Sequence, residues 1–178
     1  MRILFRKLSR QERPDERHEL TLLRPDGRRE STLCETRSVL MHDFIHYAVE
    51  GAAGIETGFW GRLAAGRTLA DMNDRAGLPS ADEAAQMATI ERFVGALSGA
   101  AKGVPAAALA AGIARYAEAT DERVPPWLTE ATVIEAQERL RRIVGAWRAA
   151  PSGAAIELDW PPAEGNAPAR VVDPGPAG

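Results

Sequence analysis

Apolar positions alternate with polar ones near both ends of the chain. Arg2 to Leu8 is rich in Ile, Leu and Phe and is short enough for a strand. Glu19 to Leu23 and Arg29 to Cys34 flank a Pro-Asp-Gly turn, whose fixed φ, side-chain acceptor and tolerance of positive φ suit a β-hairpin. Ala155 to Trp160 alternates apolar with acidic residues, which is typical of a half-buried strand. These segments predict a small antiparallel sheet.

Between the hairpin and the last strand, apolar residues recur at helical spacing. About five helices are expected there. The first runs from about Thr36 to about Glu50, and Phe59 to Asn73 forms one shorter helix or two helical turns. A third starts at a Ser80–Glu83 capping box, an alanine-rich fourth follows Pro105, and a fifth has Thr129 or Thr132 as its N-cap. The pattern predicts an α+β fold, in which a small antiparallel sheet (N-terminal strand, hairpin and C-terminal strand) has a helical bundle inserted before its last strand. We expect one domain over residues 1–160 and a flexible Pro-, Gly- and Ala-rich tail over 161–178.

Composition narrows the class of protein. The 178 residues are 45% hydrophobic and 26% charged, with a formal net charge of -3, which predicts a soluble globular protein and argues against nucleic-acid binding. No apolar run approaches the roughly 18 residues that a membrane span requires, and the N-terminus lacks the apolar core of a signal peptide. Cys34 has no second cysteine with which to form an intramolecular disulfide. Together these features favour a cytoplasmic location.

The first predicted helix carries one polar arc, formed by His42, Asp43, His46, Tyr47 and Glu50. At about 100° per residue, these positions span roughly 140° of the helix surface. The opposite arc is apolar and should anchor the helix in the core: Leu40, Met41, Phe44, Ile45, Ala48 and Val49. The arc is either the solvated or hydrogen-bonded face of an amphipathic helix or a functional site.

The spacing of His42 and His46 points to a metal, because imidazoles one turn apart project from the same face and can chelate a divalent cation such as zinc. In HExxH peptidases a glutamate after the first histidine is the general base, whereas this chain has Asp43, which is one methylene shorter. Asp43 and Glu50 are the candidate catalytic groups that would assist a bound water. Glu50 lies about 12 Å along the helix from His42, so it could instead hydrogen-bond His46 and fix its tautomer.

A further ligand would have to come from another part of the chain. The candidates are Asp71, Asp74, Glu56 and His18, although the position of His18 at the entrance of the hairpin suggests ordinary surface. Without a metal, either histidine of the arc, paired with Asp43 or Glu50, could act as a general base, since imidazole titrates near neutral pH.

A weaker candidate is the glycine-rich segment GFWGRLAAGRT, in which Arg62 or Arg67 could meet an anionic ligand. Close packing around its small residues is the favoured interpretation. Together with HDFIHYAVE, this segment resembles a family of short uncharacterised bacterial proteins that carry a similar His-Asp-x-x-His sequence. The resemblance covers roughly Leu40 to Met72 and implies no established activity.

Two classes of function follow from these observations. The first is a metal-binding domain with candidate hydrolase activity, in which His42 and His46 are the metal ligands. The alternative is a non-enzymatic protein-interaction module, whose sheet, alanine-rich helix or tail contacts another protein or a second copy in a homo-oligomer. A metal between the two imidazoles favours the first class, and imidazoles that point into bulk water favour the second.

Overall fold

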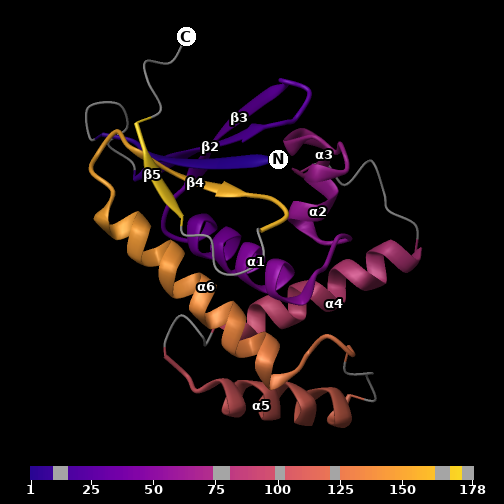
Figure 1. Cartoon of the computed structure of the whole chain (residues 1–178). Coiled ribbons are helices and arrows are strands. Elements are labelled where there is room, and N and C mark those ends of the chain that lie inside the picture. The colour runs from indigo at the N-terminus through magenta and orange to yellow at the C-terminus, as the bar shows by residue number, and fades with distance from the viewer. Residues whose placement is uncertain (10–15, 74–80, 99–102, 121–124, 163–168, 174–178) are drawn as a thin grey trace.

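The computed structural model describes residues 1–9, 16–73, 81–98, 103–120, 125–162 and 169–173, and it has the α+β architecture that the sequence predicts (Figure 1). The strands are β1 (Arg2–Lys7), β2 (Arg17–Leu23), β3 (Arg29–Glu35), β4 (Ala155–Asp159) and β5 (Arg170–Val172). The helices are α1 (Val39–Ala53), α2 (Phe59–Ala64), α3 (Leu69–Asn73), α4 (Ala81–Leu97), α5 (Ala106–Ala119) and α6 (Glu130–Ala149). All of these helices lie between β3 and β4 in the chain, which confirms the predicted insertion.

The five strands form one antiparallel sheet in the order β3-β2-β1-β4-β5, with β1 at its centre. The alternation of side chains gives the sheet one apolar face, which consists of Ile3, Phe5, Leu20, Leu22, Ile156 and Leu158. The outer face carries charged pairs, such as Arg170 with Glu157 at 2.6 Å and Arg6 with Glu19 at 2.8 Å. The sheet therefore buries one face and exposes the other to water.

The fifth strand differs from the sequence-based expectation of a tail after residue 160. Arg170 to Val172 pair with Glu157 to Ala155 of β4, so this short segment belongs to the sheet. Only three residues are involved, and such a strand is too short to show a clear alternation in the sequence. Residues 163–168 and 174–178, which the same expectation covered, lie outside the described residues.

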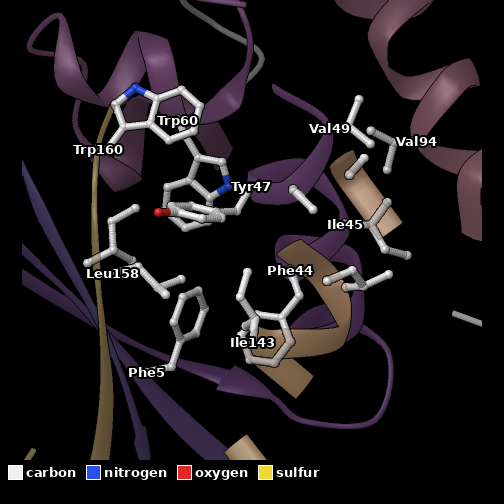
Figure 2. Close-up of a cluster of buried hydrophobic side chains, with 14 of the residues drawn as sticks. Phe5, Phe44, Ile45, Tyr47, Val49, Trp60, Val94, Ile143, Leu158 and Trp160 are labelled. Atoms are coloured by element: carbon white, nitrogen blue, oxygen red, sulfur yellow. The ribbon is translucent and has the colours of Figure 1, made fainter. Parts of the chain in front are cut away.

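Helix α1 lies at the centre of the molecule. Figure 2 shows Phe5 and Leu158 of the sheet pointing toward Phe44 of α1, while Val94 of α4 lies near Val49 of α1. The Phe5 and Phe44 rings meet edge to face at a centroid distance of 5.0 Å. Because α1 is covered from more than one direction, every one of its residues from Asp43 to Glu50 is buried.

Helices α4, α5 and α6 complete the bundle, and α5 lies furthest from the sheet (Figure 1). Helix α4 packs through an apolar stripe, since Ile90, Val94 and Leu97 are all buried at helical spacing. Thr129 is the N-cap of α6, and its side chain accepts a hydrogen bond from the backbone amide of Thr132. The Ser80–Glu83 capping box expected before α4 lies outside the described residues. No helix in the described part of the chain is long and apolar enough to cross a membrane.

Candidate metal centre

Two helices that are distant in the sequence, α1 and α4, bring His42, His46 and Glu91 together. One ligand atom from each residue lies within 4.8 Å of the other two. The Nε2 atom of His46 is 3.1 Å from Oε1 of Glu91, and the Nε2 atom of His42 is 3.3 Å from Oε2 of the same carboxylate. A single carboxylate therefore faces both imidazoles.

The three side chains differ sharply in burial. The His46 side chain is 1% exposed, whereas those of His42 and Glu91 are 52% and 46% exposed. The cluster thus has a buried floor formed by His46 and an open rim formed by His42 and Glu91. A ligand or a water molecule from bulk solvent can reach it from the rim.

The buried histidine is held from behind by a carboxylate. Its Nδ1 atom lies 2.9 Å from Oε1 of Glu50, which is itself completely buried. Among the described residues, Nε2 of His46 makes no hydrogen bond that satisfies both distance and angle, although Glu91 lies close to it. Because Nδ1 faces Glu50, Nε2 is the ring nitrogen of His46 that faces the Glu91 carboxylate.

His42 also has a carboxylate on its far side. Oδ1 of Asp43 lies 3.9 Å from Nδ1 of His42, and Asp43 is almost fully buried. The Asp43 backbone carbonyl accepts a hydrogen bond from Nε1 of Trp60 at 3.3 Å. Each histidine therefore has one ring nitrogen toward a carboxylate of α1 and the other toward Glu91.

The protonation behaviour of the cluster follows from its carboxylates. Asp43 and Glu91 raise the pKa of His42 to about 9. Burial lowers the pKa of His46, but Glu50 and Glu91 outweigh it, and the net change is upward. The two imidazoles that face the carboxyl group of Glu91, those of His42 and His46, hold its pKa well below its usual range. The centre therefore attracts positive charge, whether that charge is a proton or a metal ion.

The distances in the centre are compatible with a small divalent cation. Zinc binds histidine nitrogen and carboxylate oxygen at about 2.1 Å, and two ligands of a tetrahedral ion at that length are about 3.4 Å apart. The separations of 3.1 and 3.3 Å, which join the two imidazole nitrogens to different oxygens of Glu91, are close to that value. Two imidazoles and one carboxylate are also a donor set that zinc accepts.

The sequence predicts part of this centre. Both predicted metal ligands lie in it, and Glu50 makes the predicted contact with His46. The third member of the group is Glu91. Of the third ligands expected from the sequence, Asp71, Glu56 and His18 are not part of the group. Asp74 lies outside the described residues. Glu91 was missed because it comes from another helix and looks like an ordinary surface residue beside Arg92, and no pattern in the sequence pairs α4 with α1.

His18 corrects another expectation. It was expected at the surface, but it is completely buried and packs beside Phe5 and Trp147, at ring centroid distances of 5.9 and 6.1 Å. Its Nδ1 atom lies 3.3 Å from the hydroxyl of Thr36. The alternation of β2 places position 18 on the same face as Leu20 and Leu22, and that alternation was the available signal.

The glycine-rich segment has the close packing that was favoured for it. A Cβ atom at Gly61 would overlap the backbone of Glu56, so only glycine fits there. Arg62 donates from Nε to the carbonyl of Thr57 at 2.9 Å, and the carbonyl of Arg67 accepts a hydrogen bond from Arg24. These contacts give the segment a structural role.

No protein-family model, curated protein or solved structure matches this chain. The functional argument therefore depends on the residues and the geometry of the centre.

Proposed function

We propose that this chain is a divalent-metal-binding protein, with His42, His46 and Glu91 as the ligands and zinc as the metal that best suits them. The observation that carries the proposal is the buried Nε2 atom of His46, which lacks an aligned hydrogen bond among the described residues and lies 3.1 Å from a carboxylate oxygen. A neutral imidazole whose Nδ1 donates to Glu50 would turn a lone pair toward that oxygen. Such an arrangement is favourable when a cation lies between them.

The openness of the rim supports a catalytic type of metal site. Structural zinc sites are closed by four protein ligands, whereas catalytic sites have three and leave a position for water or substrate. Here three ligands are available, and the side chains of His42 and Glu91 are half-exposed. A bound zinc ion would lower the pKa of a water molecule to about 7 and supply a nucleophile, so hydrolysis is the reaction class to test.

The two carboxylates predicted to be catalytic differ in what surrounds them. Glu50 is fully buried and accepts hydrogen bonds from backbone amides, so it has no access to substrate and supports His46 instead. Asp43 lies on the Nδ1 side of His42, which favours orientation of that ring. A catalytic role for Asp43 stays a prediction.

The test is metal content measured by elemental mass spectrometry on tag-free protein after zinc loading and dialysis. The native chain should retain close to one equivalent of zinc, and the His42→Ala/His46→Ala variant should retain none. Glu91→Gln should bind zinc more weakly, because an amide oxygen is a poorer ligand than a carboxylate. Glu118→Gln is the matched control, since Glu118 is exposed on α5 and should have no effect.

Circular dichroism of each variant separates loss of metal from loss of fold. Folded native protein that retains no zinc, manganese or iron would overturn the proposal. The cluster would then be a proton-linked contact between α1 and α4. The search would move to interaction partners, beginning with the exposed Leu33 and Val171 on the two edge strands.

A further inference from the structure

The carboxylate of Glu50 is surrounded by hydrogen-bond donors. Oε1 lies 2.9 Å from Nδ1 of His46 and accepts a hydrogen bond from the backbone amide of Phe59 at 2.9 Å, while Oε2 accepts one from the amide of Trp60 at 2.9 Å. Its side chain is 0% exposed. An ionised carboxylate only accepts hydrogen bonds, so it matches this set of donors. The side-chain amide of a glutamine at this position would instead place its NH₂ group against one of the donating N–H groups.

Gly58 makes this arrangement sterically possible. It precedes α2 with φ of -78° and ψ of -169°, a conformation that residues with a side chain also adopt. A Cβ atom at this position would overlap the carboxyl group of Glu50. The absence of a side chain, and not the backbone conformation, is therefore what the position requires.

The pairing with Glu50 also determines which ring nitrogen of His46 faces the cluster. With the Nδ1 proton directed at Glu50, the lone pair of the neutral ring is on Nε2, the atom that faces Glu91. Carboxylates behind metal-bound histidines fix the tautomer and orientation of the ring in this way.

We infer that Glu50 is the positioning residue of this centre: held by the amides of Phe59 and Trp60 in space left by Gly58, it directs Nε2 of His46 toward the metal position. The inference rests on the proposed function for the identity of the ligand. The pairing of Glu50 with His46 can be tested separately, because it exists in the metal-free chain.

The first experiment is NMR of the metal-free full chain labelled with ¹⁵N-histidine. In the native protein, the neutral form of His46 should carry a slowly exchanging proton on Nδ1 and none on Nε2, because Nδ1 is buried and paired with Glu50. In Glu50→Gln this signal should disappear or exchange quickly. A native His46 with no proton on Nδ1 would overturn the inference, whether or not the protein binds metal.

The second experiment is zinc affinity measured by competition with a chromophoric chelator. Loss of a carboxylate behind a metal-bound histidine typically lowers affinity by about tenfold to a hundredfold, and we expect that range for Glu50→Gln and for Gly58→Ala. Gly145→Ala is the matched control for the second variant, since a Cβ at Gly145 meets nothing within 4 Å. Glu118→Gln is the control for the first.

Each outcome can be assigned to one of the two proposals. Native protein that fails to bind zinc contradicts the proposed function, while the NMR experiment still decides the role of Glu50. Variants that bind zinc like the native chain and keep the Nδ1 proton contradict the positioning role alone. If Glu50→Gln does not fold, Gly58→Ala and the native NMR spectrum decide the question.

Discussion

Two buried histidines in this molecule have opposite environments. His46, between α1 and α4, is 1% exposed and lies between the carboxylates of Glu50 and Glu91, which raise its pKa. His18, on β2, is 0% exposed and lies among the rings of Phe5 and Trp147, where burial lowers its pKa to about 4. For each of them, Nε2 lacks a hydrogen-bond partner among the described residues.

The difference shows what makes a buried histidine a candidate ligand. Burial alone favours the neutral ring and gives a core side chain. Carboxylates on both sides create a negative environment at the free nitrogen, and a cation can neutralise it. Both histidines have an Nε2 atom without a hydrogen-bond partner among the described residues, so the neighbouring charges distinguish the candidate metal centre from the core.

The largest expected effect comes from making the same substitution at both histidines. His46→Ala should reduce zinc binding below detection, because it removes the innermost ligand. His18→Ala should leave zinc affinity unchanged but should lower the free energy of unfolding by about 3 kcal/mol, because it empties a fully buried ring site. Calorimetric zinc titration and urea unfolding measure the two effects. A folded His18→Ala variant that loses zinc would break the distinction.

The pH dependence of stability should isolate His18. Its folded pKa of about 4 lies below its ordinary value of 6.5, so the unfolded chain binds the proton more readily. The contribution to stability is therefore full above pH 6.5 and is lost as the pH falls to about 4, a loss of about 3 kcal/mol. Urea unfolding over this pH range should show that the free energy of unfolding falls less steeply with decreasing pH in His18→Leu than in the native chain. Equal slopes would contradict the assignment.

Cys34 offers a further test of the surroundings of His18, because the two residues are paired between β2 and β3. Burial raises the pKa of its thiol to about 11, so little thiolate is present at neutral pH. A thiolate of higher pKa is more nucleophilic, which offsets part of this effect, and we expect alkylation at least about tenfold slower than in the urea-unfolded chain. Mass spectrometry after timed iodoacetamide treatment measures both rates, and equal rates would contradict a protected thiol.

The smallest expected effect concerns Tyr47, which shares the polar arc of α1 but is not part of the candidate ligand group. Its hydroxyl donates to the carbonyl of Asp159 at 2.8 Å and so ties α1 to β4. Tyr47→Phe should lower the free energy of unfolding by about 1 kcal/mol and leave zinc affinity unchanged. Thermal unfolding with and without zinc is the measurement. A change in zinc affinity would contradict this prediction and would mean that Tyr47 contributes to the candidate metal centre.

Local patterns account for what the sequence could predict. The alternation in Ala155 to Trp160 and the Pro-Asp-Gly turn depend on neighbouring residues only, so the main strands and the inserted helices were predictable. The spacing of His42 and His46 is equally local, and it identified two of the three candidate ligands.

The missing parts depend on contacts between distant segments. Glu91 reaches the histidines because α4 packs against α1, and β5 is a strand because β4 offers it an edge. Apart from His42, the polar arc of α1 is buried because other elements cover it, whereas an amphipathic pattern predicts an outward polar face. Each of these features depends on tertiary packing, and no short motif in the sequence indicates which distant segments pack together.

The placement of the centre between α1 and α4 has a consequence for folding in the cell. A metal ion bound by both helices would act as a reversible cross-link that closes the intervening chain, including α2 and α3, into a loop. An ion that binds only the folded chain stabilises it by about 2.7 kcal/mol at a hundred times its dissociation constant. The free energy of unfolding of the chain would then depend on the concentration of free metal.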